Sequence, residues 1–485
     1  VKCPPGNTGH PVWDTPYGRV SLIICYDDTY WEPARLSALK GADVVLYPCN
    51  SAQAITGPGE VLPGGHFTIA ATQEMCAWNG LALVGTDTTA AIMVPGRNLG
   101  MYGPGGAPIW APTGEKLAAA PLTPSTVGTD EPNVITYATI DPATFDNDQK
   151  RTLAWRRPDL YGNLALFRAP LDLHASKESH TVRAAAVQVE QFAGDRERCM
   201  QAVDEAVTPL EGDVDLVVLP AFTFTGPPAD AAGASALAEP ADGDTQAATA
   251  DIARRLGAHV VASHIERNGD HLFHRAILVG PDGALVGAYR QAHIDPERSA
   301  WAKGGDDFPV FNTPLGRIGL LLCEDARFPE AAGMMAVRRA DIIAMPTWWD
   351  GAYGGPVLED PAFFTAPYPA NAMCMWYAMA KMSQAYTVVA NAVGNGALGA
   401  SGVFTINPVK SNEVAVTASD DSAGVARLTF NTLGDPSYWI NQQQLVTGRR
   451  ADLAVPLVLD PQSDVFVRWR DAPGYDIDAW AAYTP

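Results

Sequence analysis

The sequence predicts an α/β protein built from two copies of one domain, and two observations lead to this prediction. The segment 14–48 recurs as 312–346 with a constant offset of 298 residues and without insertion or deletion. Each copy also shows the pattern of a strand, a helix and a second buried strand, an order that favours a parallel crossover connection. A long pattern that occurs twice in one chain indicates a duplicated domain.

The first copy carries a cysteine between its first strand and its helix. Residues 20–24 are apolar and rich in β-branched side chains, which is typical of a buried strand. Cys25 ends this strand, and residues 31–39 have the apolar spacing of a helix that Gly41 would terminate. A cysteine facing a helix N-terminus is well placed for a lowered pKa and nucleophilic use. The alternative is a buried structural thiol, which is the commoner role of a lone cysteine.

The pattern around both cysteines resembles the nucleophile region of the carbon-nitrogen hydrolases, the nitrilase superfamily. It reads Thr-Pro-x-Gly-Arg, a hydrophobic run, Cys-Tyr-Asp or Cys-Glu-Asp, and later Ala-Asp, a hydrophobic run and Pro. The resemblance implies a four-layer α-β-β-α sandwich, here duplicated in tandem. It also implies a Cys-Glu-Lys triad that hydrolyses amides, carbamoyl compounds or nitriles through a thioester acyl-enzyme. Cys-Tyr-Asp at Cys25 is similar to the amidases and carbamoylases, and Cys-Glu-Asp at Cys323 is similar to the glutaminase-type branch.

Composition restricts the class of partner. The chain has 485 residues, enough for two full domains, and a net charge of −21, which argues against nucleic acid and anionic membranes as partners. No apolar run of 18 residues and no signal peptide are visible, so no membrane span is expected. Seven cysteines without paired spacing indicate neither a disulfide framework nor a zinc site. We therefore expect a cytoplasmic protein that needs no cofactor or metal.

We expect a first domain at 1–175 and a second at 176–485. In the first domain the resemblance makes Cys25 the nucleophile and the backbone N–H of Tyr26 an oxyanion donor. Lys2 is a candidate for the triad lysine, with an exposed surface lysine as the alternative. The first strand and the catalytic Glu of the family are not found ahead of Cys25. We expect an upstream segment or a second chain to supply them.

The remainder of the first domain contributes fewer candidates. Residues 67–79 are predicted to form a helix, with Glu74 exposed to solvent, and residues 134–140 to form a strand. Asp28 and Glu32 are interpreted as charges at a helix N-terminus. Two further segments resemble the arginine-rich end of the family's domain and correspond to each other, namely 155–161 and 449–453.

The second domain has the family's order of segments but lacks two of its three catalytic residues. Ala221 stands where the resemblance expects the Glu, and Gln291 where it expects the Lys, so that only Cys323 remains. Loss of an oxyanion donor costs roughly 100- to 1000-fold in rate, and loss of a general base roughly another 100- to 10,000-fold. We therefore interpret this copy as catalytically inactive.

The tandem arrangement suggests an intramolecular pseudo-dimer of two sandwiches, in which the inactive copy is the structural partner; further oligomerisation is left open. For the function we expect hydrolysis of a non-peptide C–N bond in a small amide or carbamoyl compound, with release of ammonia. Three alternatives stay open. They are a nitrile-hydrolysing enzyme, a non-catalytic subunit that supports a partner enzyme, and an acyltransferase that passes the thioester to an amine.

Overall fold

The computed structural model describes fifteen stretches of the chain. They are residues 6, 9–50, 53–57, 60–61, 72–88, 91–93, 100–102, 105–121, 134–165, 178–297, 299–351, 354–358, 369–404, 415–432 and 442–472. We call residues 9–165 the first unit and residues 178–472 the second unit. The candidate Lys2 lies outside the described residues.

One six-stranded sheet organises the first unit. Its order is β1-β2-β3-β6-β9-β10, and the central strands β2, β3 and β6 are parallel. The strands are β1 (Val12–Thr15), β2 (Gly18–Leu22), β3 (Val44–Pro48), β6 (Ala82–Thr86), β9 (Pro108–Trp110) and β10 (Lys116–Ala119). The helices α1 (Glu32–Leu39) and α2 (Gln73–Asn79) connect the parallel strands. The strand-helix-strand reading of the first copy is thereby confirmed.

Shorter elements complete the first unit. Four short strands form a separate sheet of order β5-β4-β8-β7, and they are β4 (Gln53–Gly57), β5 (Glu60–Val61), β7 (Ala91–Met93) and β8 (Gly100–Tyr102). Helix α3 (Asp148–Arg151) and several 3₁₀ turns follow within residues 142–165. The predicted strand at 134–140 is wrong for the described structure, because these residues pair with no described strand and Tyr137 is 81% exposed.

The second unit contains two six-stranded sheets. The first has the order β15-β14-β13-β12-β11-β24, with β11 (Thr181–Gln188), β12 (Leu216–Val218), β13 (His259–Asn268), β14 (His271–Val279), β15 (Leu285–Arg290) and β24 (Gly424–Asn431). The second has the order β16-β17-β18-β19-β22-β23, with β16 (Val310–Thr313), β17 (Gly316–Leu320), β18 (Ile342–Thr347), β19 (Tyr386–Asn391), β22 (Gly402–Phe404) and β23 (Val416–Thr417). A two-stranded ribbon of β20 (Val393–Gly394) and β21 (Ala397–Leu398) lies beside them.

These two sheets stack face to face between two helical layers. Along β11 the side chains of Ala184 and Ala186 belong to the core between the sheets, whereas Ala185 and Val187 belong to the core beneath the outer helices. Those outer helices include α4 (Arg196–Val207), α5 (Ala231–Leu237) and α6 (Asp244–Leu256). Helices α7 (Pro329–Val337) and α8 (Cys374–Ser383) cover the other sheet. The second unit is thus an α-β-β-α sandwich, as the sequence predicts.

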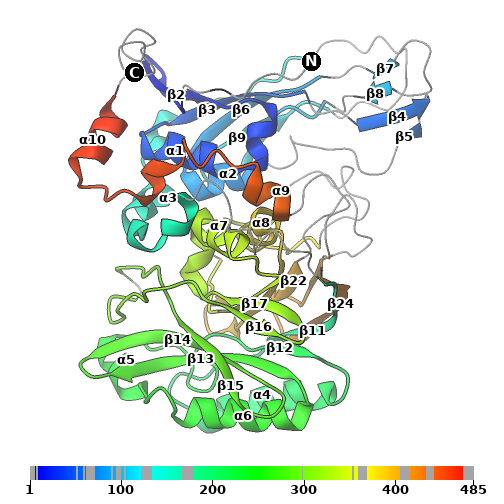
Figure 1. Ribbon diagram of the computed structural model, residues 1–485, viewed down its shortest axis with the longest axis vertical. Coiled ribbons are helices and arrows are strands. Elements are labelled where there is room, and N and C mark those ends of the chain that lie inside the picture. Colours follow the sequence, from blue (N-terminus) through cyan, green and yellow to red (C-terminus); the bar gives the residue numbers. More distant parts are fainter. Residues whose placement is uncertain are drawn as a thin grey trace.

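The two units pack helix layer against helix layer, with α1 and α2 facing α7 and α8 in the middle of the molecule (Figure 1). The indole N–H of Trp78 donates to the carbonyl oxygen of Ala326 at 2.8 Å, and a Cβ on Gly333 would lie 2.6 Å from the ring of Trp31. The C-terminal helices α9 (Gln442–Thr447) and α10 (Asp464–Asp471) return along this boundary. The described layers are therefore β-α-α-β-β-α, because the first unit contributes one large sheet where the expected eight-layer pseudo-dimer has two.

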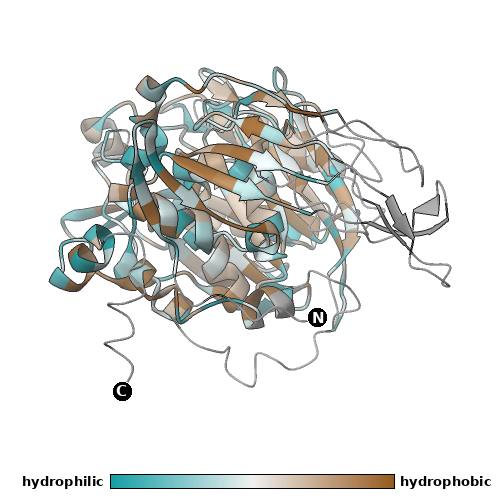
Figure 2. Ribbon diagram, turned by 90° about the horizontal axis from the view of Figure 1, so that it is seen from above, coloured by the Kyte–Doolittle hydropathy of each residue, from teal (hydrophilic) through white to brown (hydrophobic). Residues whose placement is uncertain are grey.

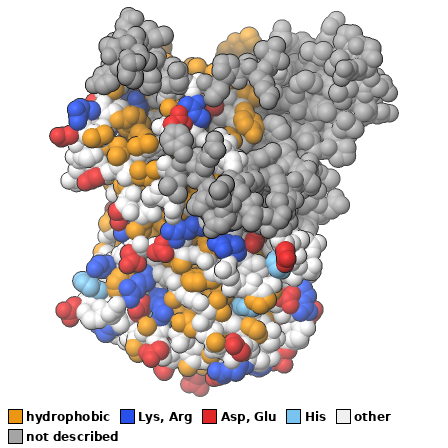
Figure 3. Space-filling model, viewed as in Figure 1, with side chains coloured by type: hydrophobic (Ala, Val, Ile, Leu, Met, Phe, Trp, Pro, Cys, Tyr) orange, Lys and Arg blue, Asp and Glu red, His pale blue; other side chains and the backbone are white. Residues whose placement is uncertain are grey.

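Surface properties agree with the composition. In the lower part of Figure 3, acidic and basic side chains are interspersed over the second unit. No helix in the described stretches is long and apolar enough to cross a membrane. Across the same stretches, no group of three or more His, Cys, Asp or Glu side chains is arranged to hold a metal ion.

Candidate active site around Cys25 and its counterpart at Cys323

Both cysteines occupy the same strained position in the two units. Each begins a 3₁₀ turn directly after a parallel strand, at Cys25–Thr29 and Cys323–Arg327. Their φ angles are +45° and +40°, in the left-handed region that residues with a side chain rarely adopt. Such strain persists only where the surroundings impose it, and it is concentrated at functional positions.

An aspartate holds each turn. Asp27 accepts a hydrogen bond through Oδ2 from the backbone N–H of Ile24 at 2.8 Å, and Asp325 accepts one from Leu322 at 2.9 Å. These bonds close the turn at its first residue and fix the direction of the cysteine side chain. The aspartate of the Cys-Tyr-Asp and Cys-Glu-Asp motifs therefore positions the thiol.

The thiol of Cys25 is half-exposed and its pKa is lowered to about 6. A hydrogen bond with Cys49 is the main cause; partial burial opposes it, and contacts with the backbone of Asn50 and Tyr26 lower the pKa further. Tyr47 holds this group together, since its hydroxyl donates to the carbonyl oxygen of Cys25 at 3.1 Å and lies 3.4 Å from Sγ of Cys49. Cys25 is thus poised to be a thiolate at neutral pH.

Beneath Cys25 lies a group of buried charges that the sequence did not reveal. Glu74 is fully buried and its Oε1 lies 2.5 Å from Nζ of Lys381, which comes from helix α8 of the second unit. The interpretation of Glu74 as solvent-exposed is therefore wrong. Asp28 is buried as well, and burial raises its pKa well above the ordinary value although the charge of Lys381 opposes the rise.

Glu32 also differs from its sequence interpretation. It lies at the start of α1, but its carboxylate forms an ion pair with Arg449 across the boundary between the units. Its negative charge thus has a specific partner in addition to the helix dipole. No feature of either local sequence points to this pairing, because the two residues are more than 400 positions apart.

The counterpart site at Cys323 is closed. Cys323 is 4% exposed, and burial raises its pKa well above the ordinary value. It belongs to an apolar cluster with Ala221, Phe222, Ala234 and Ile265, against which Leu237, Ala238, Leu272, Trp301 and Trp348 pack. A small alanine in the position of a glutamate lets this cluster close over the thiol.

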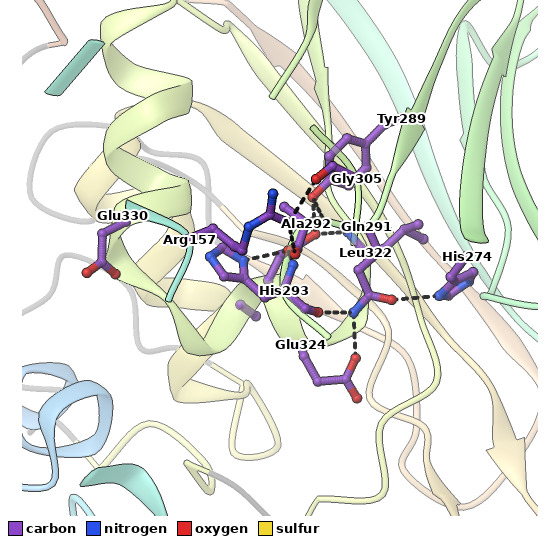
Figure 4. A network of polar contacts seen from close by, with 12 residues as sticks. Arg157, His274, Tyr289, Gln291, Ala292, His293, Gly305, Leu322, Glu324 and Glu330 are labelled. Carbon is purple, nitrogen blue, oxygen red and sulfur yellow. Dashed lines mark hydrogen bonds and ion pairs between the residues drawn. The ribbon is translucent and has the colours of Figure 1, made fainter. Parts of the chain in front are cut away.

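Gln291 lies at the centre of a hydrogen-bond network that includes Glu324, the residue after Cys323 (Figure 4). Its side-chain amide donates to Oε2 of Glu324 at 2.7 Å and to the carbonyl oxygen of His293 at 2.9 Å, while its Oε1 lies 2.9 Å from Nδ1 of His274. Burial lowers the pKa of His274 to about 4 and raises that of Glu324. The neutral amide is thus satisfied by its neighbours, and it has no charge to offer an oxyanion.

The structure brings together most of the residues selected from the sequence. Cys25 and Tyr26 lie in one site, whereas Ala221, Gln291 and Cys323 lie in the other. Cys49 is not among the residues selected from the sequence. Its position at the carboxyl end of the strand adjacent to the Cys25 strand could have indicated a neighbour of the thiol.

Comparison with known proteins places this geometry in a family. The family model for carbon-nitrogen hydrolases matches residues 1–149 and again residues 183–426. The chain therefore belongs to the carbon-nitrogen hydrolase family, and the two matched stretches agree with the duplication seen in the sequence and in the two units.

Individual relatives match over shorter stretches. A nitrilase from Pyrococcus abyssi is 33% identical over 154 residues, which are 32% of this chain and 52% of that protein. An omega-amidase from Bos taurus is 30% identical over 153 residues, covering 28% of this chain and 55% of that protein. The chain thus spans about half the length of these curated relatives. A solved amidase from Nesterenkonia is 20% identical with a TM-score of 0.42, covering 57% of this chain and 96% of its own.

Proposed function

We propose that the protein hydrolyses a non-peptide C–N bond in a small amide or carbamoyl compound, with Cys25 as the nucleophile and ammonia as a product. The observation that supports this most is the contrast between the two cysteines. Cys25 is half-exposed with a lowered pKa, whereas the equivalent Cys323 is sealed in an apolar cluster with a raised pKa. Relatives named omega-amidase, N-carbamoylputrescine amidase and citrullinase act on this class of compound by name.

The proposed reaction proceeds in two steps. The Cys25 thiolate attacks the carbonyl carbon, and the N–H of Tyr26 donates to the oxyanion that forms. The C–N bond breaks, the leaving nitrogen takes the proton that the general base received from the Cys25 thiol, and a thioester remains. Water, deprotonated by the same base, then attacks the thioester, and the C–S bond breaks to release the acid and the thiol.

Two groups of this mechanism are proposed on the family resemblance alone. The general base is a glutamate supplied from outside residues 1–485, by an upstream segment or a second chain. Lys2 is the candidate second oxyanion donor. The chain would then comprise a catalytic domain at 1–175 and an inactive domain at 176–485, which together form a pseudo-dimer. The role of the inactive domain would be structural, through the packing of α7 and α8 against α1 and α2.

A non-catalytic role is the second candidate. It is favoured by Ala221 and Gln291, which remove two catalytic groups from the second unit. In that case the protein would be a subunit that supports a partner enzyme, and Cys25 would not act on a substrate. A nitrile substrate is a further alternative, although the Cys-Tyr-Asp motif is more similar to that of amidases.

The test compares wild-type protein with Cys25→Ala and, as the matched control, Cys323→Ala. Ammonia release is measured on a panel of small primary amides, N-carbamoyl compounds and the corresponding nitriles. We expect release from at least one amide or carbamoyl compound, its loss in Cys25→Ala and its retention in Cys323→Ala. An acyl adduct on Cys25, detected by intact mass, would support the thioester. Activity that survives Cys25→Ala would reject the assignment, and activity on nitriles alone would favour the nitrile alternative.

A further inference from the structure

Cys25 has a second thiol beside it, that of Cys49. Each cysteine lies three residues beyond one member of the register pair Leu22 and Leu46, which joins the parallel strands β2 and β3. Adjacent strands are about 4.8 Å apart, so both side chains come from the same end of two neighbouring strands. Figure 2 views the molecule from the side of the first-unit sheet that contains these strands. The two thiols are hydrogen-bonded to each other.

The buried side chain of Tyr47 holds this pair of thiols in place. Its hydroxyl lies 3.1 Å from the carbonyl oxygen of Cys25 and 3.4 Å from Sγ of Cys49. On the other side, Sγ of Cys25 lies 3.9 Å from the carbonyl oxygen of Asn50, the residue after Cys49. The folded chain therefore keeps the two sulfur atoms as neighbours, and no rearrangement of the sheet is needed to bring them together.

The second unit has neither the tyrosine nor the second thiol. The 298-residue offset of the repeat places Met345 at the position of Tyr47 and Thr347 at the position of Cys49. The hydroxyl of Thr347 donates to Oδ1 of Asn391 at 3.1 Å, within its own sheet. The fold is thus stable with threonine at this position, and the thiol pair is a property of the first unit rather than a requirement of the fold.

The same two thiols are the ones that solvent reaches. Cys25 and Cys49 are partly exposed, whereas the other cysteines of the described stretches are buried, namely Cys76, Cys199, Cys323 and Cys374. Oxidation by peroxides selects the accessible cysteine with thiolate character, which in these stretches is Cys25. The thiol nearest to the oxidised sulfur is then Cys49.

We propose that Cys25 and Cys49 are a site of reversible oxidation, at which hydrogen peroxide or an organic hydroperoxide converts the two thiols into a disulfide. The Cys25 sulfur attacks one peroxide oxygen, the O–O bond breaks, and the other oxygen takes a proton and leaves as water or an alcohol. Cys25 is then a sulfenic acid. The Cys49 sulfur attacks the Cys25 sulfur, the S–O bond breaks, and the hydroxyl group leaves as water with the Cys49 proton. Two electrons thus pass from the thiols to the peroxide.

The disulfide protects Cys25 and at the same time withdraws it from reaction. A sulfenic acid without a neighbouring thiol is oxidised further to a sulfinic acid, which thiols do not reduce, whereas a disulfide returns to two thiols by exchange with a dithiol. Oxidation should therefore stop hydrolysis reversibly. This consequence rests on the proposed function of Cys25, but the formation of the disulfide does not.

Peptide mass spectrometry of peroxide-treated protein tests the proposal. Wild type is compared with Cys49→Thr, which copies the residue of the second unit, and with Cys323→Ala as the matched control. We expect wild type and Cys323→Ala to contain peptides joined through Cys25 and Cys49, lighter by two hydrogen atoms and separated by dithiothreitol. Cys49→Thr should carry sulfinic acid at Cys25, which dithiothreitol leaves in place. The identity of the product is the readout, because Cys49→Thr also changes the ionisation of Cys25 and hence the rate.

Three results in wild type would overturn the inference. They are sulfinic acid at Cys25 with Cys49 still reduced, a disulfide of Cys25 with another cysteine, and two thiols that both stay reduced. Ammonia release is followed through the same treatment. It should be lost and then regained with dithiothreitol in wild type, and lost without recovery in Cys49→Thr. A disulfide in a protein without amidase activity would refute only the proposed function, whereas activity without the disulfide would refute only this inference.

Discussion

Arg156 of the first unit and Arg449 of the second unit make equivalent contacts across the boundary, each to residues of the other unit. Nε of Arg156 lies 2.6 Å from Oε1 of Glu330, and its Nη2 donates to the carbonyl oxygen of Leu457. Arg449 pairs with Glu32 and donates through Nη2 to the carbonyl oxygen of Leu164. All three contact positions are counterparts by the repeat offsets. The boundary is therefore isologous, as in a two-fold dimer, although one chain supplies both halves.

Replacing Arg156 by Met should destabilise the protein strongly. Glu330 and both its arginine partners, Arg35 and Arg156, have side chains with no exposed surface. Removal of one cation leaves an incompletely compensated buried carboxylate, which costs about 3–5 kcal/mol of unfolding free energy. Arg449→Met is the matched control with a smaller expected loss, since its pair with Glu32 is 7% exposed and lacks a second arginine. Urea unfolding measures both; an equal loss would contradict this reasoning.

The same cluster predicts a loss of stability in acid. Burial tends to raise the pKa of Glu330, but the charges of Arg35 and Arg156 outweigh it and hold the pKa below its ordinary value. A carboxyl group with a lowered pKa in the folded state stabilises the protein above its unfolded pKa of about 4.3, and this contribution disappears as the pH falls through the folded value. The unfolding free energy should therefore fall more steeply below pH 4 in wild type than in Glu330→Gln. If the unfolding free energies of the two proteins fell in parallel below pH 4, this prediction would be refuted.

Cys49 should control the reactivity of Cys25. Since the hydrogen bond with Cys49 is the main cause of the pKa of about 6, Cys49→Ala should shift the midpoint of Cys25 alkylation towards the ordinary value of about 8.5. The midpoint is the better readout, because a thiolate of higher pKa is also intrinsically more nucleophilic. Iodoacetamide labelling of the Cys25 peptide at several pH values measures it. Cys199→Ala, which removes a buried thiol from helix α4 of the second unit, should leave the midpoint unchanged.

The features that could be predicted from the sequence are local in the chain, whereas the features that were missed join residues far apart in the chain. The positions of Cys25, Cys323, Ala221 and Gln291 came from motifs that are local in sequence, and local motifs also set the strand and turn that hold each cysteine. The pair of Glu74 and Lys381 joins residues more than 300 positions apart, and no single-sequence pattern encodes such a contact. Residues 134–140 show a further limit, because a strand needs a partner for its backbone and the sequence pattern reports only its own half.

Restoring a glutamate at position 221 should not revive the second site. Ala221 is fully buried in the apolar cluster that seals Cys323. A carboxyl group placed there lacks the room and the partners of a general base, so we expect Ala221→Glu to lower the unfolding free energy by at least about 2 kcal/mol. Cys323 should still resist alkylation under native conditions, even with Gln291→Lys added. Rapid labelling of Cys323 in a stable double variant would show that only the two substitutions separate this site from a working one.

Glu74 and Lys381, the ion pair beneath Cys25, should be removable together with little loss of stability, whereas removal of one partner alone should destabilise the protein. The strand registers make Ala378 the counterpart of Glu74 and Ala77 the counterpart of Lys381, so the other half of the boundary has two alanines where this half has an ion pair. Lys381→Ala alone leaves Glu74 buried without its cation and should cost about 3–5 kcal/mol of unfolding free energy.

The double variant Glu74→Ala/Lys381→Ala recreates the alanine arrangement and should recover most of that loss, since removing both partners of a buried pair is often close to neutral. Urea unfolding of the two single variants and the double variant forms the thermodynamic cycle. Because the charge of Lys381 opposes the rise in the pKa of Asp28, both variants that lack Lys381 should shift this pKa further upward. A double variant as unstable as Lys381→Ala would mean that Asp28, rather than Glu74, is the carboxyl group that needs the lysine.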